Sequence, residues 1–245
     1  MRLIRPDPYT QWMPVFWLSE TELTFPHPNL ANEDGILAVG GDLSSERLLL
    51  AYQYGIFPWF NPGDPILWWS PDPRFVLFPS DLKISKSMRP YFNQSKFRVT
   101  CNQAFREVIL ACQQTDRKDQ PGGTWITEEM IGAYSQLHQE GHAHSIEVWQ
   151  EERLVGGLYG LAMGEIFFGE SMFTRVSNAS KFGFISLVQK LKEHGFKLID
   201  CQQATNHLKS LGGKGISRTR FLTYLEKYTP ADSPLEDWNG LFNAQ

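Results

Sequence analysis

The chain has 245 residues, 42% of them hydrophobic and 20% charged, and its formal net charge is −4 at pH 7. This composition is typical of globular proteins that bury a core and argues against a disordered chain. Charge and proline interrupt residues 1–8, so we expect no signal peptide there, and no stretch approaches the roughly 20 apolar residues of a membrane span. The three cysteines form no C-x-x-C pair, so we expect reduced thiols. We predict a cytoplasmic monomer with no membrane partner.

The net charge hides two basic windows. From Arg74 to Arg106 there are seven Lys or Arg against one acid, and from Arg175 to Arg220 there are nine against two. The windows carry +6 and +7, which leaves −17 for the rest of the chain. Such segregation can focus positive potential on one face, as a nucleic-acid partner requires. Charge alone is equally compatible with lysines that only solvate the surface.

Residues up to about 75 are rich in proline, glycine and aromatic side chains, which indicates short strands and fixed turns. One helix fits in this part, Ser45–Tyr54, with Ser44 as its N-cap and Gly55 at its end. We predict a small amino-terminal domain over residues 1–74.

After Pro73 the periodicity becomes regular and predicts alternating strands and helices. We expect strands at Phe75–Phe78, Ala143–Trp149, Leu154–Leu161, Ile166–Phe173 and Lys197–Gln202, and helices at Asn102–Cys112, Thr127–Leu137, Ser177–His194, Asn206–Leu211 and Arg218–Tyr228. The fold class is α+β, with a largely antiparallel sheet flanked by helices over residues 75–230, followed by an irregular tail over 231–245. Antiparallel strands followed by helix, strand and helix resemble the layout of acetyltransferase-like (GNAT) domains.

The predicted strand Lys197–Gln202 carries two polar side chains among apolar ones. Side chains alternate along a strand, so Asp200 and Gln202 should share one face and Cys201 should pack in the core on the other. A carboxylate and an amide are costly to bury without partners. They are either a catalytic pair or a satisfied polar pair that ties down the following turn.

Glu170 interrupts an aromatic strand, where alternation would place it on the same face as Phe168 and Met172. It is either a functional acid or an exposed residue at a strand edge. His142 and His144 resemble a metal-binding pair, but no third ligand lies at a recognisable spacing, so we expect no metal site.

The junction Phe173–Ser180 lacks the glycine-rich turn with which acyl-CoA acetyltransferases approach a pyrophosphate. We therefore expect no coenzyme A and no other cofactor. Four tryptophans, Trp59, Trp68, Trp69 and Trp125, lie on predicted loops, where they could stack on nucleobases or pack between the domains.

A series of motifs, in chain order, resembles the leucyl/phenylalanyl-tRNA–protein transferase family over roughly residues 23–228. The motifs are Gly55-Ile-Phe-Pro-Trp-Phe, Trp68-Trp-Ser-Pro-Asp-Pro-Arg74, Gly123-Thr-Trp-Ile-Thr127, Gly141-His-Ala-His-Ser-Ile-Glu-Val148, Phe168-Gly-Glu-Ser-Met172, Asn178-Ala-Ser-Lys181 and Leu198-Ile-Asp-Cys-Gln202. The resemblance implies transfer of Leu or Phe, and Met less readily, from aminoacyl-tRNA to proteins that begin with Arg or Lys, which marks them for N-end-rule degradation. The segment Cys112–Gly123 departs from the family by its length.

The resemblance also implies roles for individual residues. Asp200 and Gln202 match the catalytic pair, Glu170 is a nearby acidic group, and Trp59 and Trp125 match the residues that hold the terminal adenosine of the tRNA. The amino-acid pocket corresponds to Leu158, Phe167, Met172, Phe184 and Ile199, and the basic patch for the acceptor stem to Lys83, Lys86, Arg89 and Arg98. The acceptor's basic side chain needs an acidic partner, for which Glu170 is the candidate.

Two alternatives remain open from the residues alone. The chain could be an acyl-CoA N-acetyltransferase, or it could bind tRNA without catalysis. Binding to coenzyme A would favour the first, and failure to transfer an amino acid from charged tRNA would favour the second.

Overall fold

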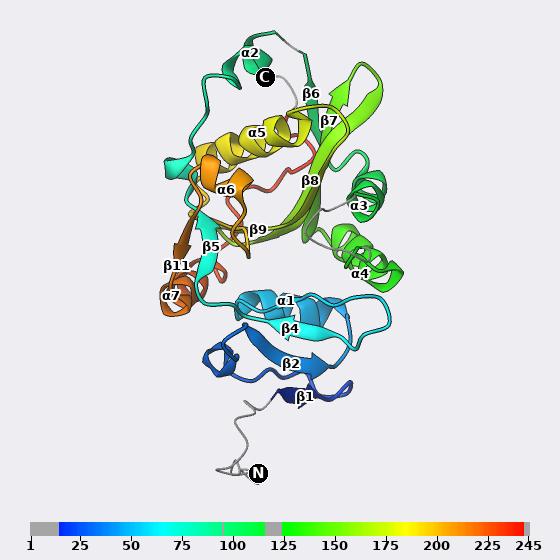
Figure 1. Ribbon diagram of the computed structural model, residues 1–245, viewed down its shortest axis with the longest axis vertical. Coiled ribbons are helices and arrows are strands. Elements are labelled where there is room, and N and C mark those ends of the chain that lie inside the picture. The colour runs from blue at the N-terminus through cyan, green and yellow to red at the C-terminus, as the bar shows by residue number, and fades with distance from the viewer. Residues whose placement is uncertain (1–14, 95, 116–123, 243–245) are drawn as a thin grey trace.

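The computed structural model describes residues 15–94, 96–115 and 124–242, so most of the long segment Cys112–Gly123 lies outside the described residues. The strands form one sheet of four strands and one of seven (Figure 1). Within these ranges, no helix combines the length and apolar character needed to cross a bilayer.

The small sheet is built from the amino-terminal part of the chain. Its order is β1 (Phe16–Leu18), β2 (Ile36–Gly40), β4 (Leu67–Trp69), β3 (Phe57–Pro58). Helix α1 (Ser45–Gln53) begins where Ser44 Oγ accepts the Arg47 N–H, and Gly55 follows it with φ +72°. The predicted helix, its cap and its terminating glycine are confirmed.

The large sheet has the strand order β11, β5, β10, β9, β8, β7, β6. Every neighbouring pair is antiparallel except β9 with β10, which run parallel. The strands are β5 (Arg74–Leu77), β6 (Arg98–Cys101), β7 (Ala143–Gln150), β8 (Arg153–Met163), β9 (Ile166–Thr174), β10 (Leu198–Asp200) and β11 (Lys214–Ile216).

Helices cover both faces of the large sheet. Helix α3 (Phe105–Gln113) and α4 (Glu128–Gln139) pack on one face, and α5 (Ala179–Glu193) packs on the other, with one hydrophobic cluster on each side (Figure 1). The remaining helices are α2 (Arg89–Asn93), α6 (Asn206–Ser210), α7 (Arg218–Tyr228) and the short 3-10 turns Pro28–Leu30 and Pro79–Asp81. The α+β prediction with a largely antiparallel sheet is confirmed.

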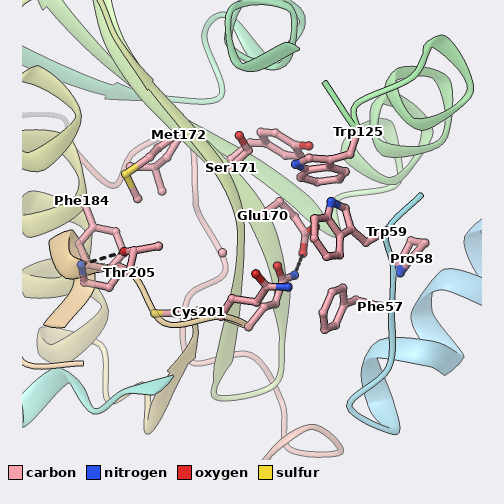
Figure 2. Close-up of a pocket in the computed structure, with 16 residues that line it drawn as sticks. Phe57, Pro58, Trp59, Trp125, Glu170, Ser171, Met172, Phe184, Cys201 and Thr205 are labelled. Atoms are coloured by element: carbon pink, nitrogen blue, oxygen red, sulfur yellow. Dashed lines mark hydrogen bonds between the residues drawn. The ribbon is translucent and has the colours of Figure 1, made fainter. Parts of the chain in front are cut away.

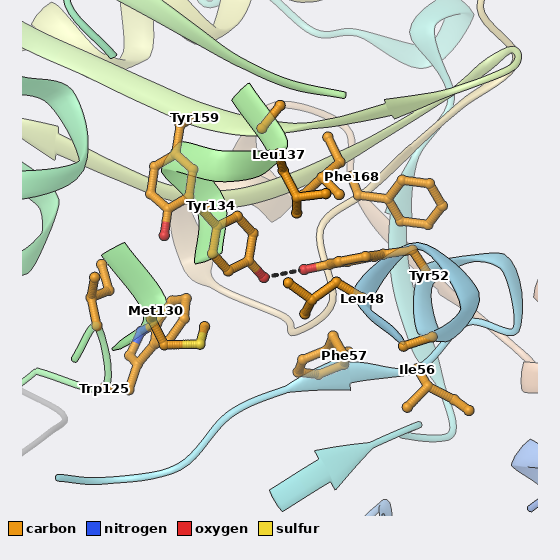
Figure 3. Close-up of a cluster of buried hydrophobic side chains, with 14 of the residues drawn as sticks. Leu48, Tyr52, Ile56, Phe57, Trp125, Met130, Tyr134, Leu137, Tyr159 and Phe168 are labelled. Atoms are coloured by element: carbon orange, nitrogen blue, oxygen red, sulfur yellow. Dashed lines mark hydrogen bonds between the residues drawn. The ribbon is translucent and has the colours of Figure 1, made fainter. Parts of the chain in front are cut away.

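The first cluster also joins the two sheets. It contains Leu48 and Tyr52 of α1 together with Tyr134 of α4 and Phe168 of β9 (Figure 3). The small sheet ends at Trp69 and the large sheet begins at Arg74, while the division of the chain into domains at 74 and 230 stays a prediction.

Residues 229–242 contain no helix or strand, yet they pack against the large sheet. Leu235, Trp238 and Leu241 are buried in the second hydrophobic cluster, and the Trp238 ring stacks on His144 at 3.9 Å between centroids. The described part of the irregular tail is therefore part of the packed core.

Candidate functional site

A cavity of about 280 Å³ lies where the two sheets meet (Figure 2). Its walls come from β3 and the residue after it, the residues before α4, β8, β9, α5, the segment that follows β10, and α6. The lining residues are Phe57, Pro58, Trp59, Trp125, Leu158, Tyr159, Gly169, Glu170, Ser171, Met172, Phe184, Cys201, Gln202, Gln203, Thr205 and Leu208.

The cavity exists because two parallel strands separate. The register of β9 and β10 ends at the pair Phe168–Asp200. Beyond this pair β9 continues as far as Thr174, while the chain after Asp200 turns away toward α6. Residues 169–172 and 201–205 therefore contribute to opposite sides of the gap.

Glu170 sits at a β-bulge in the middle of the sheet. Tyr159 pairs with Ser171 and the next residue, Gly160, pairs with Gly169, so Glu170 is the extra residue in β9. A bulge shifts the alternation of side chains and can re-aim one of them into a site. The expectation that side chains alternate regularly from Phe168 through Glu170 to Met172 is therefore wrong. The alternative that Glu170 lies at an exposed strand edge is also excluded, because Glu170 is only 9% exposed.

Both oxygens of Glu170 accept hydrogen bonds. Gln202 Nε2 donates to Oε1 at 2.9 Å and the Tyr134 hydroxyl donates to Oε2 at 3.1 Å. The Tyr134 hydroxyl also shares a short hydrogen bond with that of Tyr52 (Figure 3). A continuous chain of polar groups thus runs from α1 through α4 and β9 to the turn after β10.

Burial controls the protonation of these hydrogen-bonded polar groups. Desolvation raises the pKa of Glu170 from 4.5 to about 7, although hydrogen bonds from Tyr52 and Tyr134 act in the opposite direction. Burial, together with the Glu170 charge, raises the pKa of both tyrosines well above 10. Near neutral pH the two phenols are therefore protonated donors, and Glu170 is close to its titration point.

Gln202 occupies a turn that the alternating pattern did not predict. Strand β10 ends at Asp200, and Gln202 adopts a left-handed conformation with φ +59°. Its backbone N–H donates to Asp200 Oδ1 at 2.9 Å, and its carbonyl accepts the N–H of Phe75 at 3.3 Å. The side-chain amide is thereby directed toward Glu170, to which its Nε2 donates, and Gln202 lines the cavity.

The prediction that Asp200 and Gln202 project together from one strand face is wrong. Asp200 is fully buried, does not line the cavity, and accepts a bidentate pair of hydrogen bonds from Arg74. It contacts the backbone of Gln202, whereas the amide partner is Glu170. The physical reason is the early end of β10, which replaces alternation by a turn. The turn also brings half-buried Cys201 into the cavity wall, against the expectation of a core position.

The opposite end of the cavity is apolar. Met172 and Phe184 line it directly (Figure 2), and Leu158 is a further lining residue. Phe167 and Ile199 do not line it; they are fully buried neighbours in the β9–β10 register and belong to the same hydrophobic cluster as Leu158 and Phe184. Three of the five predicted pocket residues therefore line the cavity, and the other two lie in the hydrophobic cluster that contains or contacts those three.

Two of the four predicted tryptophans reach the cavity. Trp59 and Trp125 lie near Glu170 (Figure 2). Trp69 supports this arrangement, because its Nε1 donates to the Trp59 carbonyl at 2.6 Å. Trp68 is fully buried and donates from its indole nitrogen to Gly40.

The predicted basic patch lies outside the cavity. Lys83, Lys86, Arg89 and Arg98 are all exposed, and none of them lines the cavity wall. Of the cations counted in the basic windows, Arg74 and Arg218 are buried, so they add little to surface potential. In the part of the chain that the structure describes, no three His, Cys, Asp or Glu side chains gather at a position that could hold a metal ion.

Sequence reasoning missed Arg74, Tyr52 and Tyr134. Arg74 lies far along the chain from Asp200, and Tyr52 lies far from Tyr134. In the sequence, a tyrosine on an apolar helix face cannot be distinguished from an ordinary core residue. The only available signal was Asp200, since a carboxylate in an apolar strand demands a buried cation.

Known family models and individual relatives match most of this chain. The family model for leucyl/phenylalanyl-tRNA protein transferase matches residues 76–226, and the model for the N-terminal domain of that family matches residues 41–72. The leucyl/phenylalanyl-tRNA–protein transferase of Syntrophobacter fumaroxidans is 55% identical over 228 residues, which cover 93% of this chain and 97% of that protein. The one from Christiangramia forsetii is 60% identical over 203 residues, covering 82% and 95%.

Among solved structures the likeness is more distant. A GCN5-related N-acetyltransferase from Kribbella flavida matches with a TM-score of 0.38 and 11% identity, covering 69% of this chain and 60% of that one. A TM-score of this size carries no inference about the site.

Proposed function

Because this chain belongs to the leucyl/phenylalanyl-tRNA protein transferase family, we propose that it moves Leu or Phe, and Met less readily, from aminoacyl-tRNA to proteins that begin with Arg or Lys. The acceptor's α-amine forms a C–N bond to the ester carbonyl, the ester C–O bond breaks, and the ribose oxygen takes the proton that the amine gives up. The product then enters N-end-rule degradation in the cytoplasm. The observation that carries the proposal is a single cavity with an apolar end, a hydrogen-bonding end and two tryptophans beside the latter.

In this proposal the terminal adenosine of the tRNA binds at Trp59 and Trp125. An indole offers a face on which a nucleobase stacks, worth about 1–3 kcal/mol per base. The exposed cations Lys83, Lys86 and Arg89 are available to the phosphates of the acceptor stem.

The Leu or Phe side chain occupies the apolar end at Leu158, Met172 and Phe184. Phe167 and Ile199 do not line the cavity but belong to the hydrophobic cluster that contains Leu158 and Phe184. Such a pocket discriminates by about 1–3 kcal/mol per methylene, which fits acceptance of Leu and Phe with weaker use of Met.

The hydrogen-bonding end receives the amine. The ester is already activated, so placement supplies most of the acceleration, and well-oriented groups can contribute roughly 7–11 kcal/mol. Gln202 uses its nitrogen to bind Glu170, which leaves its oxygen to accept a hydrogen from the attacking amine. Ionised Glu170 stabilises the positive charge that develops on that nitrogen.

The acceptor's basic side chain also needs a carboxylate. Glu170 is the only carboxylate among the described residues that line the cavity. Its carboxylate lines the cavity beside the Gln202 amide, and when ionised it would pair with an ammonium or guanidinium group. This geometry supports Glu170 as the acidic group for the acceptor.

The test is incubation of the wild-type chain with Phe-tRNA and a peptide that begins with Arg. We expect the peptide to gain the mass of one Phe residue, and a matched peptide that begins with Ala to remain unchanged. Binding of Phe-tRNA without transfer would contradict the proposal, as would equal transfer to both peptides.

A further inference from the structure

Arg74, the first residue of β5, connects parts of the molecule that are far apart in sequence. It is fully buried, and its Nε and Nη2 donate to the two oxygens of Asp200 at 2.8 and 2.5 Å. Its third nitrogen, Nη1, donates to the carbonyl of Gly55 at 3.1 Å. The guanidinium thus bonds the end of β10 and the turn after α1 at the same time.

Two aromatic rings enclose the same guanidinium. The central carbon of Arg74 lies 4.7 Å from the ring centroid of Phe57 and 4.7 Å from that of Phe221. Phe57 belongs to β3 of the small sheet and Phe221 to α7. Contact with two aromatic rings combined with a bidentate carboxylate contact is a geometry that a lysine cannot reproduce.

On the β10 side, the pair fixes the turn that carries Gln202. Asp200 Oδ1 accepts both the Arg74 Nε–H and the backbone N–H of Gln202. Phe75, the residue after Arg74, donates its N–H to the Gln202 carbonyl. A non-glycine residue at φ +59° persists only where the surroundings hold it, and these contacts supply that support.

On the small-sheet side, the pair fixes the segment that leads to Trp59. Gly55 and Phe57, which both contact Arg74, precede Trp59 by four and two residues. Trp59 and Gln202 both line the cavity. Arg74 therefore contacts the segment that leads to Trp59 and, through Asp200, supports the turn that carries Gln202.

We propose that Arg74 is a positioning residue for the transfer reaction, holding Gln202 in register with Trp59, and that Asp200 acts through Arg74 and the Gln202 backbone. Asp200 does not polarise the Gln202 amide in this account, because that amide binds Glu170. The inference rests on the proposed function and adds to it the group that aligns Gln202 with Trp59.

The experiment compares four variants in the Phe-transfer assay, at a temperature where circular dichroism shows each to be folded. Arg74→Lys keeps the positive charge but loses the pair of guanidinium N–H donors that binds both oxygens of Asp200. Asp200→Asn leaves a buried guanidinium without its counter-ion. The double variant Arg74→Gln with Asp200→Asn restores a neutral, hydrogen-bonded pair whose Asn oxygen is available to the Gln202 N–H. Arg47→Lys is the matched control, because Arg47 is equally buried and pairs with Asp42 at 3.0 Å but does not line the cavity.

We expect Arg74→Lys to lower kcat at least tenfold with little change in the KM for Phe-tRNA, since a displacement of about 1 Å can cost about 100-fold. The double variant should recover at least tenfold over Asp200→Asn, whereas Arg47→Lys should lose thermal stability and keep kcat. A crystal structure of Arg74→Lys should show the Gln202 amide displaced from Glu170.

Wild-type kcat in Arg74→Lys would overturn the inference. So would a double variant as inactive as Asp200→Asn, because a direct role of the Asp200 carboxylate on the amide predicts that result. Both outcomes require an active wild-type chain, and an inactive wild type would instead remove the proposed function.

Discussion

The two ends of the cavity are built by different forces. At the apolar end, Leu158 and Phe184 are held by packing in a hydrophobic cluster that also contains Phe167 and Ile199. At the polar end, hydrogen bonds from Tyr134 through Glu170 hold Gln202. Packed cores tolerate changes of shape at modest cost, whereas a buried polar network is costly when only partly satisfied. The polar end should therefore control the rate and the apolar end the choice of donor.

The largest effect is expected at Gln202. Gln202→Ala removes the acceptor for the attacking amine, so kcat should fall by about 100- to 1000-fold, the range typical of losing one oriented group in the transition state. Affinity for Phe-tRNA should remain close to that of the wild type. The neighbouring Gln203→Ala, an amide that also lines the cavity, is the control. An equal loss of tRNA affinity in Gln202→Ala would defeat the assignment.

The next effect concerns Glu170 and pH. Its pKa is raised to about 7 in the folded chain against an ordinary 4.5, so folding favours the protonated form. This contribution to stability is fully present below pH 4.5 and is lost as pH rises through 7, by on the order of 3 kcal/mol. Urea unfolding between pH 4 and 8 should show this decline in the wild type and its loss in Glu170→Gln.

The matched control for this titration is exposed Glu128→Gln, which should retain the wild-type decline. An unchanged pH dependence in Glu170→Gln would show that another group is responsible.

A smaller effect is expected at Trp59, which lines the cavity. Trp59→Ala removes one stacking face, so the KM for Phe-tRNA should rise about tenfold while kcat changes less. Trp17→Ala is the control, because Trp17 is 79% exposed on β1 and does not line the cavity. A similar rise in KM in both variants would mean that the effect of Trp59→Ala does not come from lost stacking in the cavity.

The regular elements could be predicted from the sequence because their signals are local. Helix α1 has its serine cap and glycine end, α4 has Thr127 as N-cap, and β7, β8 and β9 follow their hydrophobic pattern. Helix α5 begins at Ala179, later than Ser177, because Asn178 before it adopts φ +67°.

The site could be predicted only as a set of residues. The family motifs identified Glu170, Gln202 and the two tryptophans, and all four line the cavity. Their geometry escaped prediction because it depends on two interruptions of strand alternation, the bulge at Glu170 and the turn after Asp200. Neither interruption contains a glycine or proline at the critical residue, and the cation that binds Asp200 lies 126 residues away.

The most direct test of the division between the two ends is a competition between Phe-tRNA and Leu-tRNA for one Arg-initiated peptide. Gln202→Ala should slow both transfers by the same factor and leave the product ratio unchanged. Phe184→Ala should enlarge the apolar end and shift the ratio toward Phe by roughly fivefold. A changed ratio in Gln202→Ala, or an unchanged ratio in Phe184→Ala, would contradict the account.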